Sequence, residues 1–407
     1  MALIKLNSRA IPDDTVIASD IADGSISTAK LAADAVTNAK LAADAVTTPK
    51  IADTVNFGRR NLIINGAMEV AQRATTYATA VSNGYHTVDR IRVMGSSNVG
   101  QWTISQDSDV PAGFVKSLKY ECTTADTSLA STDHLGLGYF PEGHHMNPVS
   151  KGTSGAKSMT LSFYMKANVS RTMVVELTDA GNARHVNFAV TPTAINTWER
   201  ITLSIPADTS GSFNQGTNSK AGELTFWLAA GTHYTSGNNQ STWTSRTAAN
   251  IMAGVSNWAD TVGNTLWITG LQLEIGDTAT PFEHQSISDE QLRCFRYYYD
   301  ARYGSNDGQA YSTSRDAQYG HIRNCMAQFP VEMRATPSVA IQSSTANSMD
   351  RYGRGQETCY PKAENIHKDH FQNIIKYTDA GQTTTDNWVD TSVGYINRAG
   401  YKADAEL

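Results

Sequence analysis

The N-terminal part of the chain repeats the unit KLAADAVT at residues 30–37 and 40–47, and apolar residues return there every five positions. Five residues advance a helix by about 500°, so an apolar stripe would drift around its surface. On a strand an odd spacing sends successive apolar residues to opposite faces. The pattern therefore predicts neither a continuous helix nor a continuous strand. Each ten residues should contain one helical turn and one short extended piece.

A single copy of this repeat cannot bury its own apolar residues, because helical pieces this short are marginal alone. Copies from several chains around one axis would bury them against their equivalents, most simply in a homotrimer. The alternative is a disordered linker rich in Ala, Thr and Asp, which the regular apolar spacing disfavours. The predicted trimer core consists of Ile21, Ile26, Leu31, Val36, Leu41, Val46 and Ile51.

Residues 57–286 show short alternating runs separated by loops rich in Ser, Thr, Asn and Gly. This pattern predicts an antiparallel β-sandwich of the jelly-roll kind. Trp198, Trp227 and Trp267 alternate with apolar residues, and we predict that they are packing residues. The predicted strands are 158–166, 172–177, 198–205, 224–229 and 266–274, of which the first two are expected to be neighbours joined by a turn.

Residues 287–407 are predicted to form a second β-rich unit, behind one short helix at 288–299. Ser288 is expected to cap this helix, with Gln291 at its third position as in a capping box. The segment 357–371 has no periodicity and is expected to be an exposed loop. The predicted strands are 326–333, 338–342 and 393–396. The chain is thus predicted to be mostly β, with units at 1–56, 57–286 and 287–407.

Composition narrows the possible functions. Charged residues make up 18% of the chain and the formal net charge is -6, against about 25% charged residues in an average globular protein. An acidic chain without a Lys/Arg block disfavours nucleic-acid binding. The sequence contains no run of about 18 apolar residues, so no membrane-spanning helix is expected. No secretory signal peptide is expected either. The four cysteines have no metal-site spacing and are predicted to be free buried thiols.

Several segments resemble bacteriophage tail fibre proteins. Residues 61–73 (NLIINGAMEVAQR) and 85–90 (YHTVDR) resemble the opening of a domain common in these fibres, and 268–283 (ITGLQLEIGDTATPFE) resembles its closing strand. The KLAADAVT repeat resembles fibre shafts of phages, including those that infect cyanobacteria. Residues 293–299 (RCFRYYY) resemble the segment that links this domain to a C-terminal tip in these fibres. Residues 329–337 (FPVEMRATP) and 403–407 (ADAEL) resemble the tip itself.

The resemblance implies a homotrimeric fibre that adheres to the host surface. Residues 1–56 would attach to a tail or baseplate protein and form the shaft, 57–286 would be similar to carbohydrate-binding jelly rolls, and 287–407 would be a trimeric tip that contacts the receptor. It implies a virion protein, assembled in the host cytoplasm, that binds surface glycan or lipopolysaccharide. The alternatives are a head or collar fibre or a tail adaptor with a structural role, and a polysaccharide depolymerase.

Catalytic signatures are missing from the sequence. It contains no GxxxxGK[ST], HExxH or GxSxG motif, and no segment concentrates acids beside aromatics as a glycosidase site would require. We therefore expect no enzyme activity and no cofactor. By analogy with carbohydrate-binding jelly rolls, Glu69 is a candidate ligand of a structural calcium ion, although no partner acid is evident on the closing strand.

Sugar binding without catalysis needs aromatic rings that stack on sugar C–H faces, beside amide and acid groups that read hydroxyls. On a helix the motif His367-Lys-Asp-His370 would bring its two histidines together as a metal site or a sugar contact near Tyr360 and Phe371, although an ordinary solvated loop is the favoured interpretation. The candidate glycan or receptor contacts in expected loops are Tyr234, Trp243, Trp258, Tyr352, Tyr360, His367, His370, Phe371 and Trp388.

Overall fold

The computed structural model describes residues 59–96, 98–301, 314–316, 321–343, 348–351, 355–377, 394–395 and 399–407. The predicted trimer core, Tyr352 and Trp388 lie outside these residues, as do the side chains of Tyr360 and Phe371. The chain divides into two units, Met1–Asn56 and Phe57–Leu407. The further boundary expected at residue 286 stays a prediction.

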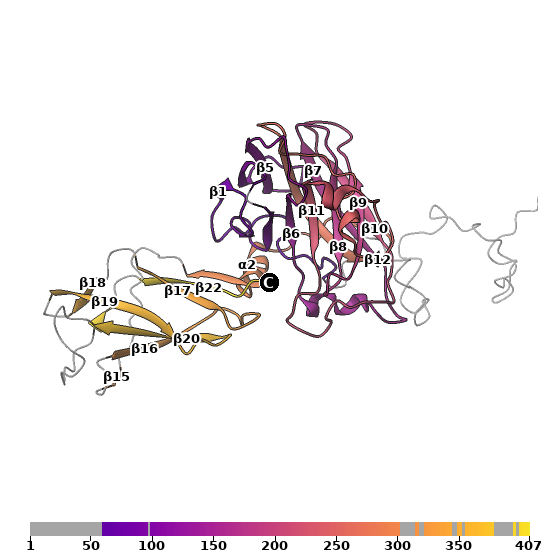
Figure 1. Ribbon diagram of the computed structural model, residues 1–407. Helices are drawn as coiled ribbons and strands as arrows, with labels where there is room; N and C mark the ends of the chain where they lie inside the picture. The colour runs from indigo at the N-terminus through magenta and orange to yellow at the C-terminus, as the bar shows by residue number, and fades with distance from the viewer. Residues whose placement is uncertain are drawn as a thin grey trace, which may run out of the picture. The chain divides into compact units, whose positions relative to one another are not determined.

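Residues 76–275 form two antiparallel sheets, coloured from indigo to salmon in Figure 1. They confirm the predicted mostly β fold and are consistent with a jelly-roll sandwich. Sheet A contains, in spatial order, β1 (Thr76–Ala80), β4 (Gln101–Asp107), β5 (Ser117–Thr124), β13 (Thr265–Ile275), β7 (Met159–Ala167) and β10 (Glu199–Ile205). Sheet B contains β12 (Thr244–Ser245), β9 (Arg184–Val190), β8 (Met173–Thr178), β11 (Leu224–Ala230), β6 (His134–Tyr139), β3 (Ile91–Gly95) and β2 (Gly84–Tyr85).

The core lies between the two sheets and follows from alternation along each strand. In β4, Trp102 and Ile104 are buried, while Thr103 and Ser105 between and beyond them are partly exposed. Phe163 of sheet A and Phe226 of sheet B meet edge to face with ring centroids 5.1 Å apart. Such a pair contributes about 0.5–1.5 kcal/mol beyond the burial of its area.

The five strands predicted within this sandwich correspond to β7, β8, β10, β11 and β13. The expected pairing of the first two is wrong, because β7 lies in sheet A and β8 in sheet B. β7 pairs instead with β10 and β13, and β8 with β9 and β11. The short connection between them crosses from one sheet to the other, which local alternation cannot reveal.

Helical elements are few in the described part of the chain. Helix α2 (Ile287–Phe295) begins earlier than predicted, because the Ser286 side chain, not that of Ser288, caps it and accepts a hydrogen bond from the Asp289 N–H. The remaining helices are η5 (Gly143–Val149), α1 (Thr232–Thr235) and η6 (Ala248–Asn250). No helix of the described residues is long and apolar enough to cross a membrane.

The C-terminal part forms a three-stranded sheet and a six-stranded sheet. The first consists of β14 (Tyr298–Ala301), β22 (Ala399–Asp404) and β17 (Ser338–Ser343). The second consists of β15 (Ser314–Asp316), β16 (His321–Gln328), β20 (His370–Tyr377), β19 (Gly355–Glu364), β18 (Ser348–Arg351) and β21 (Gly394–Tyr395). The expected loop at 357–371 is wrong, because β19 and β20 pair there as a hairpin around residues 365–369.

The motif residues 61–73 form hydrogen bonds that fix the start of the sandwich. The Asn65 side chain donates to the carbonyls of Val70 and Asp89, and it accepts from the Val70 N–H. The Asn61 amide bonds the backbone of Leu271 in β13. These bonds give a structural reason for both asparagines in the motif.

The motif residue Arg90 joins the sandwich to the C-terminal residues. Its side chain is fully buried, forms an ion pair with Glu406 and stacks over the Tyr297 ring at 3.5 Å. Arg73 bonds Asp404 at 3.0 Å and Glu406 at 3.4 Å. A buried cation without its carboxylate would be costly, so these contacts hold the last residues of the chain against the sandwich.

Candidate functional site

A row of aromatic and basic side chains crosses the outer face of sheet A. Lys119 of β5 pairs with Trp267 of β13, which pairs on its other side with Lys166 of β7. Trp198 directly precedes Glu199 of β10, and Glu199 pairs with Met165. Trp198 therefore lies beside Lys166, and we name Lys119, Trp267, Lys166 and Trp198 the tryptophan row.

Strand alternation sets the direction of these side chains. Leu266 and Ile268 are each 1% exposed in the core, so Trp267 between them points out of the sandwich. Its side chain is partly exposed, and so is that of Trp198. The expectation that these two tryptophans are packing residues is therefore wrong. For Trp227 it is confirmed, because that residue is 3% exposed.

The lysines lie next to the indole rings. The Lys166 Nζ is 4.5 Å from the centroid of Trp267 and 5.8 Å from that of Trp198. The Lys119 Nζ is 5.6 Å from the Trp267 centroid. These distances lie within the range of cation–π attraction, which fixes the rings and keeps the lysine heads on this face.

Carboxylates complete the charge balance of the row. Lys166 forms an ion pair with Asp109, and Lys119 forms one with Glu121 at 2.7 Å. The indole Nε1 of Trp198 donates to Asp109 at 3.0 Å. Burial alone would raise the pKa of Asp109, but the hydrogen bonds from Lys166 and Trp198 outweigh it and hold this pKa below its ordinary value. Asp109 is therefore ionised at neutral pH.

More aromatic residues lie beside the row on the same face. Tyr164 pairs with Thr269 of β13 and with Arg200 of β10, whose guanidinium is 5.9 Å from the Tyr164 ring. Phe114 is buried, at 8% exposure, and packs against Tyr164 with the ring centroids 5.2 Å apart. The face thus combines flat apolar rings with carboxylates and ammonium groups, the pattern that binds sugar rings by stacking and reads their hydroxyls.

The loop aromatics predicted from the sequence have structural contacts. Trp258 is 0% exposed and donates its Nε1–H to the Thr172 carbonyl at 3.1 Å, so the expectation of a surface ring there is wrong. Trp243 is partly buried against the core, with the Lys151 Nζ 3.7 Å from its ring. Tyr234 is partly buried beside Trp227 and Met252.

The two predicted histidines lie at the hairpin turn between β19 and β20 rather than on a helix. The rings of His367 and His370 stack with their centroids 4.7 Å apart, and His370 bonds Asp369 at 2.8 Å. The His367 side chain is exposed. Whether they contact a receptor stays a prediction.

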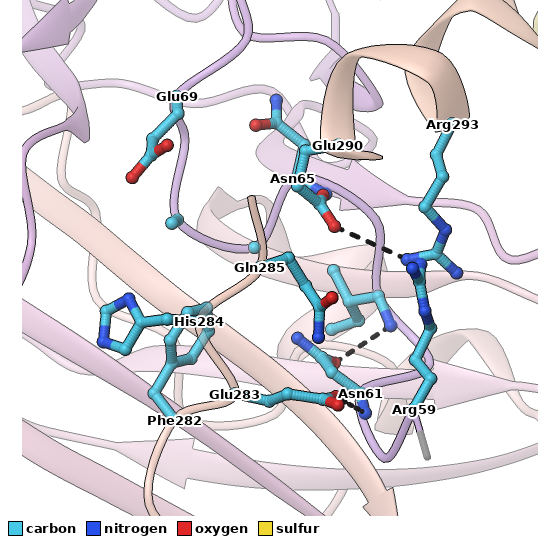
Figure 2. Close-up of a pocket in the computed structure, with 13 residues that line it drawn as sticks. Arg59, Asn61, Asn65, Glu69, Phe282, Glu283, His284, Gln285, Glu290 and Arg293 are labelled. Atoms are coloured by element: carbon cyan, nitrogen blue, oxygen red, sulfur yellow. Dashed lines mark hydrogen bonds and ion pairs between the residues drawn. The ribbon is translucent and has the colours of Figure 1, made fainter. Parts of the chain in front are cut away.

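Glu69 lines a small pocket, shown in Figure 2. The pocket has a volume of about 20 Å³, room for about one water molecule. Glu283 accepts from the backbone N–H groups of Arg60 and Asn61, and Glu290 accepts from that of Asn65. In Figure 2 the Glu69 carboxylate lies apart from both. The described residues contain no group of three or more His, Cys, Asp or Glu side chains that could hold a metal, so they do not support the calcium site.

Two of the four cysteines have described side chains. Cys122 and Cys294 are buried free thiols, as predicted. Burial, with nearby Asp260, raises the pKa of Cys122 to about 11, and burial also raises that of Cys294. Both are therefore protonated and unreactive at neutral pH.

Comparisons with known proteins find similarity in structure only. No family model and no curated protein sequence matches the chain. The enzymatically active domain of a bacteriophage CBA120 tailspike protein is 12% identical over 53% of this chain, with a TM-score of 0.29. The match spans only 21% of the tailspike chain.

Carbohydrate-binding modules are also similar. The module TmCBM61, solved with β-1,4-galactotriose, is 11% identical over 54% of this chain and 100% of its own, with a TM-score of 0.27. A family 11 module of a Clostridium thermocellum cellulosomal cellulase is 9% identical over 54% of this chain and 97% of its own, with a TM-score of 0.24. At such TM-scores the similarity carries no binding property to this chain.

Proposed function

We propose that this protein is a phage tail fibre that binds a glycan of the host surface through the outer face of sheet A, without cleaving it. The observation that carries the proposal is the tryptophan row, in which two partly exposed indoles and a lysine between them lie on a regular sheet. Rings held by a sheet are pre-ordered, so little entropy is lost when a sugar stacks on them.

The virion role is supported by the sequence. The segments 61–73 and 268–283 resemble those of tail fibres, and the repeat at 30–47 needs partner chains to bury its apolar residues. In a homotrimer each fibre would present three copies of the tryptophan row. Weak contacts to single sugars would then combine into strong adhesion, because linked sites raise the effective concentration of one another.

Non-catalytic binding is supported by the chemistry of the row. A glycosidase needs one carboxylic acid that stays protonated near neutral pH. Asp109 instead has a lowered pKa and is held by Lys166 and Trp198. Its carboxylate suits a hydrogen-bond acceptor for sugar hydroxyls rather than a general acid.

Binding of the purified full chain to an array of bacterial surface polysaccharides tests the proposal. We expect binding by the wild-type protein and weaker binding by Trp267→Ala, with no new reducing ends released from the bound polysaccharide. Absence of binding to any polysaccharide would contradict adhesion and favour the structural alternative of a head or collar fibre. Release of reducing ends would favour a depolymerase.

A further inference from the structure

A hollow with a volume of about 540 Å³ lies where the loops before β4 and after β5 meet. The hollow is wide and open to solvent, so a ligand would lie across it rather than be enclosed by it. Among the residues that the structure describes, no aromatic residue and no lysine or arginine lines it. The lining residues are Asn98, Gly100, Gln101, Thr124, Ala125, Asp126, Ser128, Ala130 and Asp133.

The side chains of this hollow leave hydrogen-bonding capacity unused. In the described part of the chain, the amides of Asn98 and Gln101 make no hydrogen bond, and both residues are exposed. Of the two acids, Asp126 accepts from the Ser128 N–H at 2.9 Å and keeps one oxygen free of hydrogen bonds. Both oxygens of the buried Asp133 are occupied, by the Ala130 N–H at 2.9 Å and the Ser96 hydroxyl at 3.1 Å. Amides, hydroxyls and carboxylate oxygens are the groups that read sugar hydroxyls.

The hollow adjoins the face that carries the tryptophan row. Gln101 lies on the outward side of β4 with Thr103 and Ser105, because Trp102 and Ile104 between them are buried. Ser105 pairs with Lys119, which pairs with Trp267. The path from Gln101 to Trp267 covers about 13 Å along the strand and about 10 Å across two strand spacings, roughly 16 Å in all.

We propose that the hollow is a second sugar subsite, so that the face takes an extended, uncharged oligosaccharide rather than a single terminal sugar. This inference rests on the proposed function and names its ligand class. An acidic sugar is disfavoured, because Asp126 and Asp133 would repel it and no lysine or arginine of the described ranges lines the hollow. In the tryptophan row, both lysines are already paired with carboxylates.

Calorimetric titration of the full chain tests the inference. The probes are hexose oligosaccharides from the disaccharide to the hexasaccharide, in the linkage that the polysaccharide array selects, and the matching uronic acid series. Wild-type affinity should rise with length in the neutral series. Trp267→Ala should weaken binding at every length. Gln101→Ala should weaken the hexasaccharide about five-fold, the order expected for one or two neutral hydrogen bonds, and leave the disaccharide unchanged.

Gln291→Ala is the matched control, because Gln291 is an exposed glutamine on α2 outside the hollow. Its affinities should equal those of the wild type. The inference is overturned if Gln101→Ala and Asn98→Ala both bind the hexasaccharide as the wild type does, or if uronic acid oligosaccharides bind as tightly as neutral ones. In either case the proposed function would stand. If no oligosaccharide binds the wild type, the proposed function fails with it.

Discussion

The outer faces of the two sheets carry the same kinds of residue but expose them differently. On sheet B, Trp227, Glu176 and His185 are 3%, 1% and 0% exposed. On sheet A, Trp267 and Trp198 are partly exposed. Tryptophan, acid and base therefore build a structural network on one face and an accessible surface on the other.

The outer face of sheet B is less exposed because one segment, residues 231–258, covers it. This segment includes α1, β12 and η6. Ile251 and Met252 of this segment pack on Val174 and Trp227. Its Arg246 reaches Glu176 at 2.8 Å. The aromatics first expected to bind sugar, Tyr234 and Trp243, belong to the segment and pack inward, as does Trp258 at its end.

The segment that covers sheet B also changes the surroundings of the Glu176 carboxylate. Glu176 accepts hydrogen bonds from His185 and Arg246, both at 2.8 Å, and from the Trp227 Nε1 at 3.1 Å. Burial alone would raise the pKa of Glu176, but the bonds from His185 and Arg246 outweigh burial and lower it. The same type of group holds the fold together on sheet B and remains open to a ligand on sheet A.

The largest expected effect is that of Glu176→Ala. Removing this carboxylate leaves Arg246 without its partner and His185 without its hydrogen bond, so the free energy of unfolding should fall by about 3–5 kcal/mol. Chemical denaturation measures the change. Asp277→Ala, which removes an exposed acid, is the control and should change it by less than about 0.5 kcal/mol. Equal effects of the two variants would contradict the contrast between the faces.

A reciprocal pair of tryptophan variants sharpens the comparison. Trp267→Ala should weaken glycan binding by about 2 kcal/mol, as loss of a central aromatic contact does, with little change in melting temperature. Trp227→Phe should lower the melting temperature, because it leaves a cavity and removes one of the hydrogen bonds to Glu176, yet keep the affinity. Calorimetric titration measures the affinity of both variants, and thermal unfolding measures their melting temperatures. Loss of binding in Trp227→Phe alone would place the site on sheet B.

The sandwich itself could be predicted, because strand alternation is local. The run Leu266-Trp267-Ile268 also predicts which way the Trp267 side chain points, because a residue between two core residues of a strand must face outward. The alternation of apolar residues around Trp267 therefore predicts an outward side chain and argues against a packing role. An outward tryptophan is a packing residue only where another segment covers it, as happens to Trp227.

The cover itself could not be predicted from the sequence. The sequence predicts a polar loop rich in Ser, Thr, Asn and Gly at residues 232–241 and gives no sign that residues 231–258 cover a sheet. Their contacts with β8 and β9 include pairs of residues that are 64 or more positions apart in the chain, as between Asn187 and Ile251. Trp258 therefore looked like an exposed ring. That β7 and β8 belong to different sheets could not be predicted for the same reason, because long-range contacts leave no local periodicity in the sequence.

Acid should weaken the network on sheet B. The lowered pKa of Glu176 means that its stabilisation is complete above the unfolded value, about 4.3 for a glutamate, and is lost as pH falls through the folded value. We expect the difference in unfolding free energy between the wild type and Glu176→Gln to be constant near pH 7 and to shrink as pH falls below about 4.3. Denaturation curves across this pH range measure it, and a difference that grows in acid would show the opposite linkage.

The smallest expected effect is that of Asp109→Asn on sheet A. The side chain of Asp109 is 43% exposed, and exposed ion pairs contribute at most about 1 kcal/mol. The unfolding free energy should therefore change by less than this, and the change should shrink further in 1 M salt because salt screens exposed charges. A larger, salt-insensitive loss would mean that the Lys166–Asp109 pair is structural, as Glu176 is on sheet B. The tryptophan row would then be part of the scaffold rather than a surface kept open for a ligand.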